Sequence, residues 1–228
     1  MSRLSLKSVL RFLSLAALAG LIISLLLTVP LRWLNPPTTA FILLDSNARS
    51  ADMRAHWTPL SEIAASMPIA VVASEDQRFP THFGFDFSSI WQALHDNNGP
   101  MRGASTISQQ LSKNLYLWSG RSLFRKGIEA WFTLLIELTW PKERILEVYL
   151  NVVEFGPGVY GVGQASETFF NKPASQLTRF EASVLAAVLP NPKQLSAQRP
   201  STYVYRRAHD IRTAIRYLGG PSYLAGIR

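Results

Sequence analysis

An uncharged apolar run of twenty residues, Phe12–Leu31, constrains this chain more than any other feature of its sequence. A run of that length crosses a lipid bilayer as a single helix. The residues before the run include three basic ones, namely Arg3, Lys7 and Arg11. Because basic residues collect on the cytoplasmic side, we expect the N-terminus in the cytoplasm and the rest of the chain outside.

A cleaved signal peptide is the alternative interpretation of the same run. The run is long for a signal peptide, however, and Thr28-Val29-Pro30 lacks the small residues of a cleavage site. We therefore predict a membrane-anchored protein with cytoplasmic residues 1–11, a transmembrane helix over 12–31, a linker over 32–56 and one globular domain over 57–228.

The composition narrows the classes of function. The chain has 228 residues, of which 47% are hydrophobic, so a sizeable core can form. It has no cysteine, which excludes disulfides and thiolate metal sites. Its net charge of +8 suits an anionic partner. A domain tethered outside a membrane is a poor nucleic-acid binder, which leaves lipid surfaces and lipid-linked phosphates.

Beyond the anchor, apolar residues recur at helical spacing almost throughout. The exception is Phe41–Asp45, which we predict to be a short strand. Alternating strands and helices and a phosphate-loop glycine motif are missing from the sequence, which disfavours a Rossmann fold. We predict a mostly α-helical domain with helices over 60–67, 68–74, 87–96, 106–117, 124–140, 142–152, 161–170, 178–189 and 202–218.

Between Asp96 and Glu129 the sequence has no acidic residue, whereas it has five basic ones: Arg102, Lys113, Arg121, Arg125 and Lys126. A stretch whose charged residues are all positive can simply be a solvated face of the protein. Here it includes predicted helices with apolar neighbours, which favours a cationic cleft that binds an anion.

Within that interval, Gly103–Asn114 predicts a helix with one polar face. Hydroxyl, amide and ammonium groups on one face suit sugar hydroxyls and phosphate oxygens. An ordinary amphipathic surface helix is the alternative, but a helix N-terminus without a nearby acid favours an anion site. The candidate binding residues are Ser105 and Thr106, either of which fits the N-cap, and Gln109, Gln110, Lys113 and Asn114.

The next helix is almost wholly apolar from Gly127 onward and is predicted to be the central buried helix. A buried glutamate in it, Glu129, is costly unless paired. Arg125 and Lys126 lie one turn before it and can both reach it. Glu129 is therefore either part of a structural ion pair or a carboxylate that aligns these cations toward a ligand. Glu137 has no such partner in sequence.

Glu75 follows a short apolar helix and is the candidate proton acceptor. A helix C-terminus disfavours an anion, which makes a half-buried glutamate there a competent base. The residues that follow are predicted to support it: Asp76 as a brace, Phe79 in the core, His82 bonded to Asp76 or to the backbone, and Gly84 at the bend. By contrast, the C-terminal basic residues Arg206, Arg207, Arg212 and Arg216 are predicted to form a solvated or lipid-headgroup face.

These stretches resemble, in order, five motifs of the bacterial peptidoglycan glycosyltransferases. The similarity covers residues 57–192, and five motifs in sequence are far more specific than one. The chain ends without Ser-x-x-Lys or Lys-Thr-Gly, so it resembles the monofunctional biosynthetic peptidoglycan transglycosylases. The matching segments are Glu75–Asp86, Gly103–Asn114, Arg125–Ala130, Lys142–Lys172 and the tail Phe180–Pro192.

The resemblance implies a lysozyme-like helical domain with a smaller membrane-facing lobe over residues 83–118. It implies a polymerase that elongates glycan strands from lipid II by β-1,4 bonds, with undecaprenyl diphosphate released on the periplasmic side of the bacterial inner membrane. Glu75 would be the general base and Glu129 the second essential glutamate, which we assign to holding Lys126 and Arg125. The positions that would line the donor and diphosphate sites are Ser105, Thr106, Gln109, Lys113, Asn114, Arg121 and Lys126.

The same resemblance sets the expected partners. They are lipid II, the nascent glycan strand, the bilayer and other cell-wall synthesis and division proteins, but not nucleic acid. No obligatory cofactor or protein-bound metal is expected, although a divalent cation bridging the diphosphate is compatible with the sequence.

Two other functions are compatible with a lysozyme-like fold. A lytic enzyme that cleaves glycan needs a general acid and a second working carboxylate. A synthase instead needs one base and positive charge for a diphosphate, which is a good leaving group. The cations of the acid-free interval therefore favour synthesis. An inactive anchored scaffold for cell-wall synthases is the other alternative, and the intact Glu75, Lys113 and Glu129 argue against it.

Overall fold

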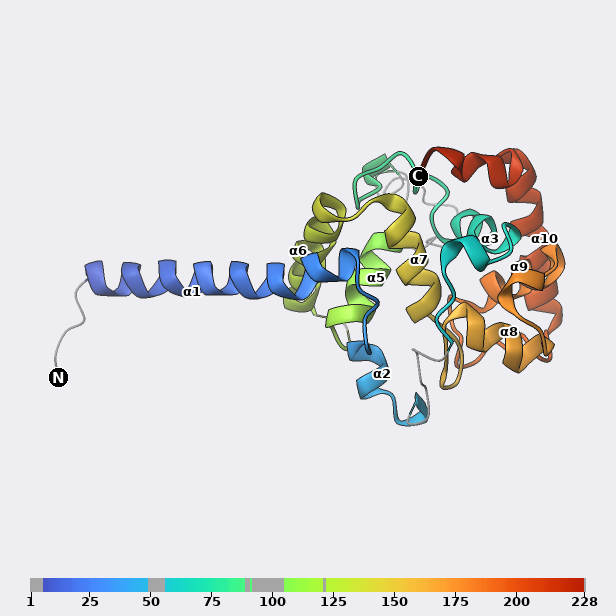
Figure 1. Cartoon of the computed structure of the whole chain (residues 1–228), viewed down its shortest axis with the longest axis horizontal. Coiled ribbons are helices and arrows are strands. Elements are labelled where there is room, and N and C mark those ends of the chain that lie inside the picture. The colour runs from blue at the N-terminus through green and yellow to red at the C-terminus, as the bar shows by residue number, and fades with distance from the viewer. Residues whose placement is uncertain (1–5, 49–55, 89–90, 92–104, 121, 228) are drawn as a thin grey trace.

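The computed structural model describes residues 6–48, 56–88, 91, 105–120 and 122–227. Figure 1 shows a long N-terminal helix that projects from a rounded helical domain. The α-helices are α1 (Leu6–Thr28), α2 (Ala40–Leu44), α3 (Ser66–Glu75), α5 (Ile107–Tyr116), α6 (Leu123–Thr139), α7 (Lys142–Val152), α8 (Val162–Phe170), α9 (Arg179–Val188) and α10 (Thr202–Tyr217). The predicted mostly α-helical class is confirmed.

Shorter elements join these helices. The 3-10 helices are η1 (Val29–Arg32), η2 (Ser46–Ala48), η3 (Leu60–Glu62), η4 (Ala174–Gln176) and η5 (Gly220–Ile227). Strands β1 (Glu154–Gly156) and β2 (Val159–Tyr160) form an antiparallel hairpin in which Glu154 pairs with Tyr160 and Gly156 with Val159. This hairpin was not predicted, because two or three residues are too few to show an alternating pattern.

One continuous hydrophobic core holds the domain together. α3, α9 and α10 pack against one another, while α5 packs against both α6 and α7. α7 is the most deeply buried helix of the second group, and its side chains at Ile145, Leu146, Val148 and Leu150 are fully inaccessible to solvent. The C-terminal end of α3 and the middle of α5 meet between the two groups of helices.

The prediction that 124–140 forms the central buried helix is wrong. α6 turns much of its apolar side to solvent, with 93% of Leu123, 74% of Phe124 and 63% of Leu138 exposed. Its buried residues include a polar row at successive four-residue steps, namely Arg125, Glu129, Thr133 and Glu137. The apolar pattern predicted the helix correctly, but it did not indicate which side of the helix points inward.

Two further predictions need correction. Phe41–Asp45 is not a strand: it lies mostly in α2, where the Thr39 hydroxyl caps the helix by accepting the Ile42 N–H at 3.2 Å. The helices predicted over 60–67 and 68–74 are instead η3 and a single α3, because Pro68 occupies the first turn, where a missing N–H costs little. The helix predicted over 87–96 lies mostly outside the described residues.

The last six predicted helices, from α5 to α10, agree with the structure within one residue at each end.

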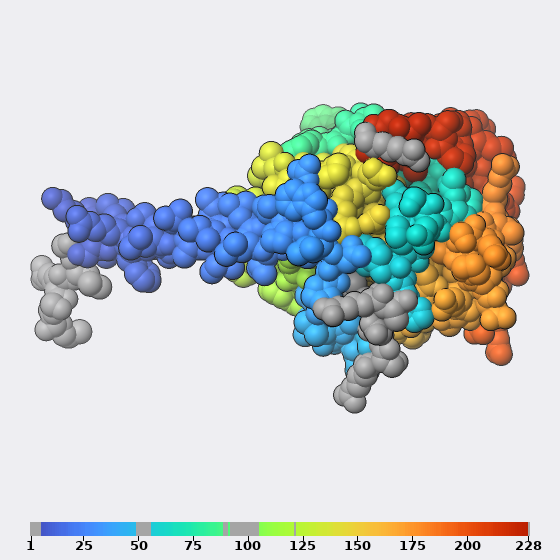
Figure 2. Space-filling view, viewed as in Figure 1, coloured from blue at the N-terminus to red at the C-terminus, as the bar shows by residue number. Residues whose placement is uncertain are grey.

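The segment Leu6–Arg32 is long and apolar enough to cross a membrane. Figure 2 shows α1 extending from the domain as a separate rod. Its C-terminal end is fixed to the domain, because the Trp140 indole donates to the Thr28 carbonyl at 3.0 Å. The Arg32 guanidinium donates to the Thr139 carbonyl at 2.7 Å, and Arg144 donates to the Leu31 carbonyl at 3.1 Å. α1 therefore leaves the domain at the junction of α6 and α7.

Candidate active site

The carboxylate of Glu75 is held at both oxygens where α3, α5 and α10 meet. Its Oε1 accepts from the Ser74 hydroxyl at 2.8 Å and from Arg207 Nη2 at 3.3 Å. Its Oε2 accepts from the Gln110 amide at 3.1 Å, and the Tyr149 hydroxyl donates to the Gln110 carbonyl oxygen at 2.8 Å. With 12% of its side chain exposed, Glu75 is mostly buried but reachable from solvent.

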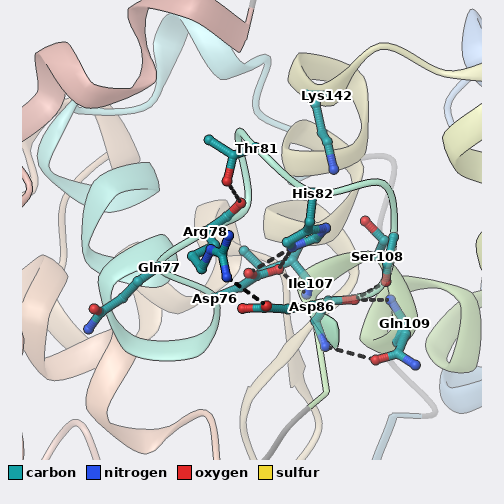
Figure 3. A network of polar contacts seen from close by, with 12 residues as sticks. Asp76, Gln77, Arg78, Thr81, His82, Asp86, Ile107, Ser108, Gln109 and Lys142 are labelled. Atoms are coloured by element: carbon teal, nitrogen blue, oxygen red, sulfur yellow. Dashed lines mark hydrogen bonds and ion pairs between the residues drawn. The ribbon is translucent and has the colours of Figure 1, made fainter. Parts of the chain in front are cut away.

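Asp76 braces the chain next to Glu75 (Figure 3). Both of its oxygens lie 2.9 Å from His82 Nε2, and Oδ2 also accepts the Ile107 N–H at 2.9 Å. A carboxylate at the N-terminus of α5 is favoured by the helix dipole. Asp76 therefore ties the turn after α3 to the start of α5, and it is the partner of His82 that the sequence suggested.

Phe79 and Gly84 hold the shape of this turn. Phe79 is completely buried, as predicted, and the Lys142 ammonium lies 4.6 Å from its ring centroid. Gly84 has a φ of +75°, and a Cβ there would lie 2.9 Å from Thr133 Cγ2. A side chain at this position would meet both backbone strain and a steric clash.

The N-terminus of α5 is closed by a capping box. Thr106 is the N-cap: its hydroxyl accepts the Gln109 N–H at 3.2 Å, and the Gln109 side chain accepts the Thr106 N–H at 3.0 Å. The Thr106 hydroxyl also donates to the Gly84 carbonyl at 2.7 Å. Both residues are buried and their polar groups position α5, so Thr106 is confirmed as the N-cap. The binding role predicted for the two residues stays a prediction.

Lys113, one turn after Gln110 on α5, is a partly buried cation without an ion-pair partner within 4 Å among the described residues. Burial lowers the pKa of its ammonium group. The charges of Glu129 and Glu75 act against that effect, while Arg125 and Lys126 add to it. Lys113 is thus within electrostatic range of both glutamates and both cations, in a setting where an anionic ligand would neutralise it.

Glu129 pairs with both cations that the sequence offered. Its Oε2 lies 2.8 Å from Arg125 Nη1, and its Oε1 contacts Lys126 Nζ. Arg125 is buried and also donates to the Gly120 carbonyl at 2.7 Å, whereas 49% of the Lys126 side chain is exposed. Arg125 therefore faces inward, and Lys126 is the cation of the pair that a ligand can reach.

Comparison with known proteins agrees with this arrangement. Residues 44–216 match the model of the transglycosylase family. The biosynthetic peptidoglycan transglycosylase of Pseudomonas syringae pv. syringae B728a is 51% identical over 229 residues, which cover 97% of each chain. Those of Pseudomonas entomophila L48 and Stutzerimonas stutzeri A1501 are 50% and 51% identical and cover 96% and 90% of this chain, and 96% and 88% of their own lengths. The chain belongs to the peptidoglycan transglycosylase family.

The resemblance and the enzyme class predicted for this transglycosylase are thus confirmed, while the roles of its individual residues remain predictions. The structure brings Glu75, Gln110, Lys113, Glu129 and Lys126 into one region. Ser105, which is half-buried, directly precedes the N-cap of α5, and Asn114, which is buried, lies near the end of that helix. Arg121 lies outside the described residues.

Two residues of the transglycosylase have partners that the sequence did not reveal. Arg207, predicted to face solvent or lipid headgroups, is paired with Glu75. It lies 132 positions further along the chain, so local spacing could not signal the contact. Glu137, which had no evident partner, accepts from the Ser108 hydroxyl at 2.5 Å and from Lys142 Nζ at 2.7 Å.

Proposed function

We propose that this transglycosylase polymerises glycan strands from lipid II, a disaccharide-pentapeptide carried on undecaprenyl diphosphate. The observation that carries the proposal is that one partly accessible carboxylate, Glu75, lies within electrostatic range of Lys113, a cation without an ion-pair partner among the described residues. Glu129, the other carboxylate there, is already bound by two cations. One base facing positive charge suits displacement of a diphosphate better than cleavage between two working carboxylates.

In the proposed reaction, a sugar hydroxyl of the acceptor attacks the anomeric carbon of the donor. Glu75 takes the hydroxyl proton as the new carbon–oxygen bond forms. The bond to the diphosphate breaks, its electron pair leaves with the diphosphate, and Lys113 and Lys126 neutralise the departing charge. An α-linked donor then gives a β-1,4 product by a single inverting displacement. Glu129 acts by holding Lys126 toward the diphosphate.

The bilayer is the proposed partner of the exposed apolar side of α6. Besides Leu123, Phe124 and Leu138, this side includes Trp131 and Leu134. Exposed aromatic residues of the predicted membrane-facing lobe add to the apolar surface, namely Phe83, Phe87, Trp91 and Trp118. Aromatic and aliphatic side chains of this kind favour the boundary of a bilayer. With α1 as a single-pass anchor, the domain would lie on the periplasmic face of the inner membrane.

No obligatory cofactor is part of the proposal. Among the residues that the structure describes, no group of three or more His, Asp and Glu side chains could hold a metal ion. A divalent cation in the reaction would therefore take its ligands mainly from the diphosphate oxygens. Other cell-wall synthesis and division proteins remain proposed partners.

The decisive experiment uses the full chain in detergent micelles with fluorescently labelled lipid II. Long glycan strands on a denaturing gel would support synthesis. Shortening of strands made beforehand by another enzyme would show a lytic activity instead. If the protein does neither, while remaining folded by circular dichroism, the scaffold alternative is favoured and the proposed polymerase is rejected.

Lys113→Ala is expected to lower kcat/KM for lipid II by about 30-fold, or about 2 kcal/mol, because a buried diphosphate would lose its cation. Arg179→Ala is the matched control, since it removes one positive charge from an exposed position on α9. Steady-state polymerisation rates for the two variants provide the comparison. Equal kcat/KM for Lys113→Ala and wild type would remove Lys113 from the donor site.

A pH series tests the same residue without deleting its charge. Because burial lowers the pKa of Lys113, its ammonium form is lost at a lower pH than in an ordinary lysine. Donor binding that depends on that charge is present below this pKa and weakens as the pH rises through it. Lys113→Arg keeps the charge at alkaline pH, so the alkaline fall in kcat/KM should move to higher pH.

A further inference from the structure

We propose that Arg207 is a positioning residue for Glu75: it fixes Oε1 of the carboxylate so that Oε2 accepts the proton of the attacking hydroxyl. This inference rests on the proposed function, in which Glu75 is the base. It adds a residue from α10, an element outside all of the motifs that suggested the family, and it assigns different tasks to the two oxygens of one carboxylate.

The Oε1 side of Glu75 is a closed arrangement of donors. Arg207 Nη2 lies 3.0 Å from the Ser74 hydroxyl oxygen and 3.3 Å from Glu75 Oε1. The Ser74 hydroxyl lies 2.8 Å from Oε1 and 3.3 Å from the Ala186 carbonyl, so its one proton goes to the nearer Glu75. Oε1 thus receives a charged and a neutral hydrogen bond, and a proton added there would meet two donors.

The Oε2 atom of Glu75 has a different kind of hydrogen-bond donor. Its partner among the described residues is the neutral amide of Gln110. Tyr149 donates to the other end of that amide and so turns its NH2 group toward Glu75. Burial, with the charges of Glu75 and Asp76 adding to it, raises the pKa of Tyr149 well above its usual value, so its hydroxyl remains a donor. Oε2 keeps a lone pair for the incoming proton.

α10 places Arg207 by ordinary helix packing. Val204, Ala208 and Ile211 are buried against α9 and α3, which aims Arg207 at the C-terminal end of α3. Within the described chain, the Arg207 Nε is buried without a hydrogen-bond partner. An unpaired buried donor is destabilising. Only the Nη2 end of the guanidinium is held, by Ser74 and Glu75. Because the unpaired Nε makes this placement unfavourable for stability, contact with the Glu75 carboxylate explains it better.

The charged and titratable groups around Glu75 come from several elements. Arg207 approaches from α10, Lys113 from α5 and Tyr149 from α7, while Asp76 follows in sequence. From α9, the Ala186 carbonyl reaches Ser74. A cation in contact with a carboxylate favours its deprotonated form. Of the two cations, Arg207 is the one in direct contact, so its removal should change the pH dependence of the reaction.

The test is the pH profile of lipid II polymerisation by the full chain carrying Arg207→Gln. We expect the acid-side midpoint of kcat/KM to move to higher pH, because the carboxylate loses the cation in contact with it. At neutral pH, kcat should fall by about tenfold while KM stays within about twofold, since a base in the wrong orientation slows only the chemical step. Arg207→Lys should recover most of the midpoint shift but less of kcat, because an ammonium lacks the planar fork.

Arg206→Gln is the matched control, because Arg206 is the exposed neighbour on the same helix and loses the same charge. Its kcat, KM and pH profile should equal those of wild type. An unchanged acid-side midpoint in Arg207→Gln would overturn the proposal. If KM is then higher than in wild type, Arg207 binds lipid II itself. If no kinetic constant changes, the ion pair of Arg207 with Glu75 is structural. If Arg207→Gln does not fold, the kcat and midpoint of Arg207→Lys decide between these outcomes.

Failure of this inference is separable from failure of the proposed function. If wild type makes no strands from lipid II, the polymerase proposal fails first. If wild type polymerises and Glu75→Gln does not, yet Arg207→Gln behaves as wild type at every pH, only the role of Arg207 is rejected.

Discussion

Glu75→Gln is expected to lower kcat for glycan polymerisation by about 10³-fold, because an amide cannot accept the proton of the attacking hydroxyl. The replacement keeps the size of the side chain and an oxygen that can accept from Ser74 and Arg207. Binding of lipid II should therefore change little. Initial rates of strand formation by the full chain in detergent, at saturating lipid II, measure the effect.

Glu62→Gln serves as the control for this substitution, since Glu62 is an exposed glutamate on η3. It should polymerise at the wild-type rate. A Glu75→Gln enzyme that retains more than about a tenth of wild-type kcat would show that Glu75 is not the essential base. The remaining carboxylates of the site, led by Glu129, would then need the same test.

The helices from α5 to α10 were predictable because their signal is local. α7 begins and ends where the sequence predicted, since apolar residues at three- and four-residue spacing mark its buried side. The orientation of α6 was not predictable in the same way. Spacing groups Arg125, Glu129 and Thr133 on one face, but only tertiary packing decides that this polar face is buried while much of the apolar side is exposed.

The same difference between local and tertiary signals applies to the candidate site. Glu75, Gln110 and Lys113 belong to short motifs with a fixed spacing, so a reading of the sequence could nominate them together. Arg207 and Tyr149 reach the site from α10 and α7, and no local pattern links either to Glu75. The capping box of Thr106 and Gln109 could be predicted only in part: Thr106 was a candidate for the N-cap, but the reciprocal contact from Gln109 was not predicted. The same hydroxyl and amide groups can bind a ligand or close a helix, and only coordinates distinguish the two.

Glu129→Ala is expected to lower the free energy of unfolding by about 3 kcal/mol, because it leaves the Arg125 guanidinium buried without its carboxylate. Lys126 adds little to this loss, since its side chain is half exposed and water can solvate it. Urea unfolding of the full chain in detergent, followed by tryptophan fluorescence, provides the measurement. Asp210→Ala, which removes a carboxylate that is 72% exposed, should change stability by less than about 0.5 kcal/mol.

A double replacement separates the two possible roles of Glu129, which are a structural ion pair with Arg125 and the positioning of Lys126 toward the diphosphate. Replacing both buried partners with apolar residues, as in Arg125→Met with Glu129→Leu, should restore most of the stability, because no unpaired charge is left inside. If Glu129 also holds Lys126 toward the diphosphate, this folded variant should still polymerise lipid II at least about 100-fold more slowly than wild type. Recovery of activity together with stability would mean that Glu129 contributes a structural ion pair alone. In that case Lys113 would be the cation on which departure of the diphosphate depends.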